Sequence, residues 1–185
     1  VDSLFFASTT MPFVDMLNSG IIRAALTLEE ETECVDISST LKSGTTALIQ
    51  ALDKVKSGNS NYSIVSASDK RKARSASSQE LDFGDAAVAI AVDNKNLIAK
   101  YINSSSLSID FIDHFRQPSE EFDYNWEERW IRDEGYLKIV PKAIEELFSK
   151  ANISGSDINH FILPSVFPRV DQMIAKKCGI SPENV

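Results

Sequence analysis

The chain has 185 residues, of which 43% are hydrophobic, and this is enough for a globular domain with a sizeable core. Its 27 acidic and 19 basic residues give a net charge of −8, which argues against nucleic-acid binding because phosphate contacts need clustered Lys and Arg. The longest apolar run, residues 86–92, is far shorter than the roughly 20 residues that span a bilayer, so we expect no membrane association.

Alternating apolar and amphipathic segments predict strands separated by helices. The expected strands are at residues 3–9, 33–39, 61–69, 84–94, about 97–111 and 160–165. The expected helices are at residues 14–26, from 40 or 41 to 57, around 137–151 and about 169–178. A Ser-, Lys- and Arg-rich surface segment covers 66–78, and an acidic, aromatic stretch covers 118–136. This order predicts an α/β fold in which helices flank a mixed, largely buried sheet.

The helix expected from Thr40 or Leu41 follows directly on a strand. Gly58 ends it, and its apolar side recurs every three or four residues, at Leu41, Thr45, Leu48, Leu52 and Val55. Free N–H groups and the positive dipole end at such a helix N-terminus stabilise a thiolate or another anion. The junction therefore suits a nucleophile at position 41, but a leucine cannot be one.

Two short patterns overlap in this junction. Ser39 to Lys42 reads as S-x-x-K, and Lys42 to Gly44 reads as K-[ST]-G, the signatures of penicillin-binding proteins and β-lactamases. In those enzymes the two lysines are different residues that converge on the serine, whereas here Lys42 would have to be both. A P-loop is also excluded, because Lys42 precedes the glycine. Neither pattern therefore predicts a site.

The cysteines and the chain ends complete these observations. Cys34 and Cys178 lie far apart in unlike contexts, so we expect neither a disulfide framework nor a metal site. We therefore expect a reducing, cytoplasmic location. The chain opens on an apolar, strand-like run without an initiator Met or a signal-peptide pattern, and no terminal element follows its last residues. We expect it to be a fragment of a longer protein.

Three segments carry a resemblance to a known family. "CVDISSTLKSGTTALIQAL" (34–52) resembles the nucleophile strand, turn and helix of the thiolase superfamily, and most closely those of the hydroxymethylglutaryl-CoA synthases and type III ketoacyl-ACP synthases. "FGDAAVAIAV" (83–92) resembles the family's Phe-Gly-Asp-Gly-Ala strand, with Ala86 in place of the second glycine. "INHFILPSVFPRV" (158–170) resembles the segment that carries the catalytic His.

The resemblance implies a thiolase-like layered α/β fold (αβαβα) that is incomplete in this chain. Residues 1–94 would be the end of the N-terminal half, and residues 95–185 the start of the C-terminal half. The family implies a homodimer, or a heterodimer with an active paralogue. It also implies a coenzyme A or acyl-carrier thioester as substrate, without a covalently bound cofactor.

Carried over residue by residue, the resemblance implies a degenerate catalytic site. The family's cysteine, five residues after a strand-ending aspartate, falls on Leu41, since Asp36 is that aspartate. The family's histidine falls on Pro164 or Ser165, depending on one gap. Glu80 is nearest to the acidic residue of the hydroxymethylglutaryl-type enzymes, although it also fits a solvated loop carboxylate.

No remaining cysteine or histidine is expected to replace the missing groups. Cys34 lies seven residues before position 41, which is roughly 23 Å along an extended strand. Cys178 fits a buried small hydrophobe at a helix end. His160 begins the strand whose far end would hold the catalytic His, and His114 matches no family motif, so both fit a structural or surface role.

A short basic cluster is the remaining candidate for substrate binding. It consists of Lys70, Arg71, Lys72 and Arg74. These side chains could contact the phosphates of coenzyme A or an acidic carrier protein, and they also fit a solvated loop.

Two functional hypotheses follow from the resemblance. In the first, the chain comes from a homologue of acyl-CoA and acyl-carrier condensing enzymes in lipid or polyketide metabolism. It lacks the catalytic Cys and His, and so binds acyl-CoA or acyl carrier protein or supports a partner. In the second, the protein is an active thiolase-like enzyme that forms or cleaves carbon–carbon bonds by a mechanism without cysteine, using residues from the missing half.

Overall fold

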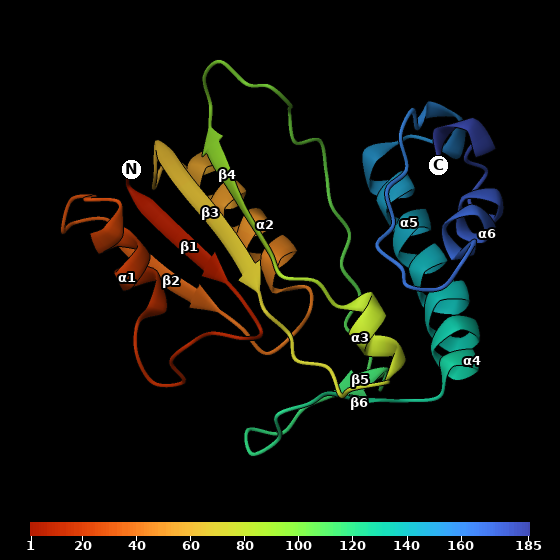
Figure 1. The fold of residues 1–185 in the computed structure, drawn as a ribbon. Coiled ribbons are helices and arrows are strands. Elements are labelled where there is room, and N and C mark those ends of the chain that lie inside the picture. The colour runs from red at the N-terminus through yellow and green to blue at the C-terminus, as the bar shows by residue number, and fades with distance from the viewer. The chain divides into compact units, whose positions relative to one another are not determined.

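A computed structural model describes all residues from Val1 to Val185. The chain forms two compact units, each made of two segments (Figure 1). Unit 1 consists of Val1–Arg71 and Phe83–Tyr101, and unit 2 of Lys72–Asp82 and Ile102–Val185. None of the helices combines the length and the apolar character that crossing a membrane requires.

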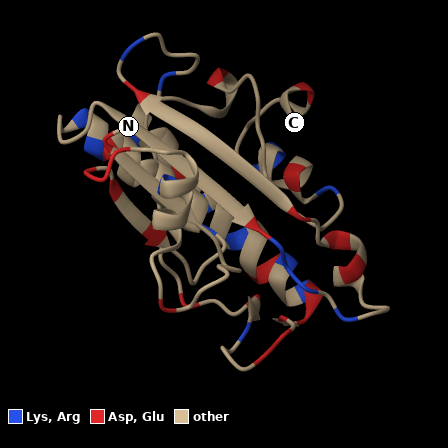
Figure 2. Ribbon diagram, turned by 60° about the vertical axis from the view of Figure 1, so that its left-hand side comes forward, with Lys and Arg blue, Asp and Glu red and all other residues tan.

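Unit 1 is built on a four-stranded mixed sheet in the order β2-β1-β3-β4. Strand β1 is parallel to both β2 and β3, and β4 is antiparallel to β3. The elements are β1 (Ser3–Ala7), α1 (Asn18–Ala25), β2 (Glu33–Ile37), α2 (Ser43–Lys56), β3 (Tyr62–Asp69) and β4 (Ala86–Asp93). Strands β1, β3 and β4 carry no charge except Asp69 and Asp93 at strand ends, as the tan ribbon shows (Figure 2). The predicted mixed α/β sheet is confirmed for this unit.

Helix α2 packs on the sheet through small side chains. Its buried positions are Ser43, Ala47, Ala51 and Val55, each four residues after the last. Of the predicted apolar side, Val55 is confirmed as buried, but Leu48 and Leu52 are only partly buried, Thr45 is exposed, and Leu41 precedes the helix. Alanines let the helix backbone approach the central strands, where Phe5 and Val65 complete the core.

Both helices of unit 1 begin later than predicted. Helix α2 begins at Ser43, because Ser39 has a left-handed backbone (φ 74°) and a turn follows it. Helix α1 begins at Asn18 rather than Val14, since a carboxylate on the neighbouring strand binds the N–H groups at Asn18 and Ser19. The predicted stop at Gly58 is confirmed, with a φ of 79° just past the end of α2.

Strand β4 differs from the expectation of a largely buried sheet. Its residues from Ala86 to Ala91 are exposed, and Val92 alone is buried. Strand β4 lies at the sheet edge and pairs with β3 only, so one side of its backbone and most of its side chains stay accessible. Its continuous apolar run therefore did not indicate burial within this chain.

Unit 2 is mainly helical. Its elements are α3 (Ser78–Asp82), β5 (His114–Phe115), β6 (Tyr124–Asn125), α4 (Glu128–Trp130), the π-helix η1 (Ile131–Tyr136), α5 (Leu137–Ala151), the 3₁₀ turns η2 (Gly155–Asp157) and η3 (Pro182–Asn184), and α6 (Val170–Lys177). The predicted helices 137–151 and 169–178 are confirmed by α5 and α6. The predicted strands 97–111 and 160–165 are wrong, since these segments pair with no neighbouring strand.

The packing of α5 and α6 in unit 2 requires one glycine. A Cβ at Gly155 would lie 2.3 Å from the carbonyl oxygen of Cys178, which is far inside van der Waals contact. The turn after α5 therefore approaches the end of α6 closely enough that only a hydrogen fits between the two backbones.

Candidate functional site

Position 41, the candidate nucleophile position, lies in a turn that is stabilised by hydrogen bonds between the residues on either side of it. The carbonyl oxygen of Thr40 accepts hydrogen bonds from the Ser43 N–H at 3.0 Å and the Ser43 hydroxyl at 2.6 Å. The Lys42 N–H donates to the Thr40 hydroxyl at 3.4 Å. Leu41 lies within this turn, 54% exposed, immediately before the 14-residue helix α2. The structure thus places position 41 at the N-terminus of a long helix, with an apolar side chain there.

Asp36, five residues before Leu41, has a structural role that the sequence did not reveal. Its carboxylate accepts hydrogen bonds from the Asn18 N–H (2.7 Å), the Asn18 amide (3.0 Å) and the Ser19 N–H (2.7 Å). Burial raises the pKa of Asp36, but these hydrogen bonds from Ser19 and Asn18 outweigh it and lower the pKa. Asp36 therefore caps α1 from the adjacent strand.

A second aspartate lies at the same edge of the sheet, where the parallel strands end. One carboxylate oxygen of Asp69 accepts hydrogen bonds from Ser8 (3.1 Å), from the N–H and hydroxyl of Thr9 (2.7 and 3.0 Å) and from Thr10 (2.9 Å). Burial raises the pKa of Asp69, and these donors lower it further than burial raises it. The carboxyl ends of parallel strands are where α/β sheets bind ligands. A cavity of about 430 Å³ opens there beside Asp69, and Leu41 does not line it.

The four residues of the predicted basic cluster make separate contacts, and the first two belong to unit 1. The Lys70 ammonium lies 3.4 Å from the carboxylate of Asp85. The Arg71 guanidinium lies over the ring of Phe83, 5.0 Å from the centroid. Both side chains thus contact residues that directly precede strand β4.

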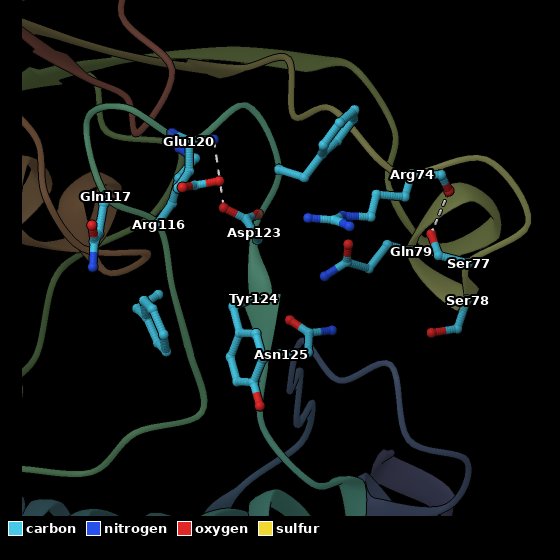
Figure 3. Close-up of a pocket in the computed structure, with 12 residues that line it drawn as sticks. Arg74, Ser77, Ser78, Gln79, Arg116, Gln117, Glu120, Asp123, Tyr124 and Asn125 are labelled. Carbon is cyan, nitrogen blue, oxygen red and sulfur yellow. Dashed lines mark hydrogen bonds and ion pairs between the residues drawn. The ribbon is translucent and has the colours of Figure 1, made fainter.

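The other two members of the cluster belong to unit 2. The Lys72 ammonium pairs with Glu121 at 2.7 Å. The Arg74 guanidinium lies over the ring of Phe122, 5.4 Å from the centroid, and has no carboxylate partner. Of the four basic residues, Arg74 is the one that lines a cavity without an acidic partner (Figure 3).

Glu80 contacts its own loop. Its carboxylate accepts a hydrogen bond from the Ala76 N–H at 2.7 Å, and the side chain is exposed on α3. This contact stabilises the turn before α3. A catalytic role for Glu80 stays a prediction.

The predicted histidine position lies beside a tyrosine. The Tyr136 hydroxyl donates to the carbonyl oxygen of Pro164 at 3.3 Å, and its ring packs edge-on against Phe167 at 5.7 Å. Ser165 accepts from the Phe167 N–H at 3.0 Å. Burial raises the pKa of Tyr136, a hydrogen bond with Ser165 lowers it, and the charge of Asp113 raises it, so that the pKa is raised overall. No motif in the sequence pointed to Tyr136.

The remaining titratable candidates belong to local contacts. His114 Nδ1 lies 2.8 Å from the carboxylate of Asp113. The pKa of Asp113 is lowered overall, since burial raises it but the hydrogen bond and charge of His114 lower it. Burial raises the thiol pKa of Cys34 and of Cys178, which is the opposite of the shift that activates a nucleophilic cysteine.

Comparisons with known proteins were made by sequence and by structure. No family model matches the chain. In sequence, the chain is 23% identical to the hydroxymethylglutaryl-CoA synthases of Caldivirga maquilingensis, over 185 residues, and of Aeropyrum pernix, over 186 residues. Each match covers 100% of this chain and 53% or 51% of the relative. The chain thus spans about half the length of the curated relatives it matches.

Solved structures show the same likeness. A hydroxymethylglutaryl-CoA synthase complexed with CoA matches with a TM-score of 0.84 and 18% identity, over 96% of this chain and 46% of that one. The 3-oxoacyl-[acyl-carrier-protein] synthase III of Aquifex aeolicus matches with a TM-score of 0.85 and 18% identity, over 100% of this chain and 60% of that one. The predicted resemblance is confirmed, and the chain has the thiolase-like α/β fold.

Proposed function

We propose that this relative of the hydroxymethylglutaryl-CoA synthases handles acyl thioesters without forming a thioester on cysteine. The observation that carries the proposal is Leu41, which lies in the turn between strand β2 and helix α2 where the resemblance implies the family's nucleophile. Support comes from the thiolase-like fold and from the CoA bound by a solved structure of similar fold. The protein would bind acyl-CoA or acyl carrier protein reversibly, or support an active partner.

The chemistry of the other candidate groups supports binding rather than acyl transfer. Neither Pro164 nor Ser165 carries a ring nitrogen that shuttles a proton as imidazole does. The thiols of Cys34 and Cys178 have raised pKa values, and so little of either is a thiolate. With neither nucleophile nor base, a thioester bound at the turn of Leu41 would be held but not cleaved.

The assembly that we propose is a homodimer, or a heterodimer with an active paralogue. It is supported by an apolar, exposed segment that leads into α1, next to edge strand β2. Its exposed side chains are Phe13, Val14, Met16 and Leu17. We further propose that residues 1–94 and 95–185 belong to successive halves of a longer cytoplasmic protein.

The test is to incubate the full-length protein with radiolabelled acyl-CoA. We expect the wild-type protein to bind the label reversibly and to retain none after denaturation. We expect Leu41→Cys to become covalently acylated, because the helix N-terminus would stabilise its thiolate. Leu48→Cys, on the same helix and partly buried, is the matched control and should stay unlabelled. Covalent label on the wild-type protein, or no acyl-CoA binding by any variant, would contradict the proposal.

A second candidate function is favoured by the hydroxyl groups of Tyr136 and Ser165, which lie together at the predicted histidine position. A neutral phenol with a raised pKa can donate a hydrogen bond to an enolate oxygen. The protein would then form or cleave carbon–carbon bonds without a cysteine. Tyr136→Phe should abolish such an activity and leave acyl-CoA binding intact, whereas an activity that survives this change would exclude Tyr136.

A further inference from the structure

Unit 2 contains a cavity of about 560 Å³ between the segment 74–79 and the hairpin of β5 and β6 (Figure 3). This volume lies within the range of roughly 300–1,000 Å³ that is typical of small-molecule sites. All of its lining residues belong to unit 2, and so none of the candidate residues of unit 1, Leu41 included, takes part in it.

One buried polar side chain that lines the cavity has no hydrogen-bond partner within the chain. Gln79 is only 6% exposed, and its carboxamide makes no hydrogen bond within the chain although it is directed at the cavity (Figure 3). Burying an amide without a hydrogen bond is unfavourable, so buried polar side chains normally have a partner. Because the carboxamide of Gln79 has no partner within the chain and faces the cavity, it is available for a hydrogen bond to a ligand.

Two arginines, Arg74 and Arg116, and two carboxylates, Glu120 and Asp123, line the cavity. Arg116 lies 3.5 Å from Asp123, whose side chain is 1% exposed, and these two charges offset each other. Arg74 has no carboxylate partner, and its guanidinium is held over the ring of Phe122. A guanidinium fixed in this way presents its N–H fork for bidentate binding of a carboxylate or phosphate.

The rest of the wall suits an organic ligand rather than a bare ion. The rings of Phe115 and Tyr124 lie 5.0 Å apart and form an apolar side. The carboxamide of Asn125 adds a donor and an acceptor, and Glu120 adds an acceptor for a hydroxyl or amino group. The site therefore combines one cationic end with an aromatic wall.

We propose that this cavity binds a small organic anion. Its carboxylate or phosphate group would contact Arg74 and the carboxamide of Gln79, and its apolar body would pack against Phe115 and Tyr124. This inference goes beyond the handling of thioesters, because it rests on residues of unit 2 alone.

The test is isothermal titration calorimetry of the full-length protein in a low-salt buffer, with four probes. Benzoate and acetate test a carboxylate, and phenyl phosphate and inorganic phosphate test a phosphate. We expect saturable binding of at least one anion type, with the aromatic probe tighter than its small counterpart. The type that binds more tightly identifies which anion the natural ligand carries.

Two substitutions test the assignment of the contacts. Arg74→Gln and Gln79→Leu should each weaken binding about tenfold or more, as expected for the loss of a charge-assisted or buried hydrogen bond. Arg71→Gln is the matched control, because Arg71 also stacks on a phenylalanine but lies in unit 1. Arg74 is exposed, so its substitution should leave the fold intact even where Gln79→Leu fails to fold.

Two results would overturn the proposal. One is the absence of saturable binding by all four probes, and the other is an equal loss of affinity in the Arg71 and Arg74 variants. The acyl-CoA labelling experiment tests position 41, whereas the calorimetry with small anions tests Arg74 and Gln79. Either proposal can therefore fail while the other stands.

Discussion

Removal of the Asp36 carboxylate should destabilise the protein by separating α1 from β2. Asp36 accepts three hydrogen bonds, two of them from backbone N–H groups of Asn18 and Ser19, which are almost fully buried. A hydrogen bond to a charged group contributes about 1.5–3 kcal/mol, and loss of a helix cap costs about 1–2 kcal/mol. Since the contributions overlap, we expect Asp36→Ala to lower the free energy of unfolding by about 2–4 kcal/mol, and Asp36→Asn by about half as much.

The stabilisation by Asp36 should also depend on pH in a defined direction. Its folded-state pKa is lowered, because hydrogen bonds from Ser19 and Asn18 outweigh the burial that raises it. A depressed pKa gives a stabilisation that is present above the unfolded-state pKa of about 3.9 and is lost as the pH falls through the folded-state pKa. The difference in stability between wild type and Asp36→Asn should therefore shrink at acidic pH.

The measurement is urea unfolding, followed by circular dichroism at neutral pH and again near pH 3. Asp15→Asn is the control, since this exposed aspartate makes no side-chain hydrogen bond. If Asp36→Ala were no less stable than Asp15→Asn, or if its deficit persisted unchanged at pH 3, the capping role of Asp36 would be refuted.

Three further substitutions test the backbone and the sheet edge. Ser39→Gly should stabilise the turn by about 1 kcal/mol in urea unfolding, because Ser39 has a φ of 74° that glycine adopts without strain; a loss of stability would contradict this. Gly155→Ala should lower the free energy of unfolding by about 2 kcal/mol or more, because the alanine Cβ would clash with the Cys178 carbonyl oxygen. An unchanged melting temperature would show that the turn after α5 can move to relieve this clash. Asp69→Ala should increase hydrogen exchange at the Thr9 N–H, which donates a hydrogen bond to the Asp69 carboxylate. Unaltered protection of this N–H would show that the hydrogen bond does not stabilise the loop.

The sequence was most informative where one local pattern was enough. Strands β1, β2 and β3 and helices α2, α5 and α6 lie where their apolar periodicity predicted them, within a few residues. The segments 97–111 and 160–165 carry strand-like patterns but form no strand. A strand needs a neighbour to accept its hydrogen bonds, and the identity of that neighbour is not a local property. The same reason explains β4, whose apolar run lies exposed at an edge.

The candidate site divides in the same way. The sequence by itself determined that position 41 lies between a strand and a helix and carries Leu41 rather than a nucleophile, because chain order and residue identity suffice for that. The tertiary structure alone decided that Asp36 caps α1, that Tyr136 lies beside the predicted histidine position, and that Arg74 and Gln79 share a cavity. These contacts join residues between five and about thirty positions apart, through non-periodic side-chain geometry that only packing specifies.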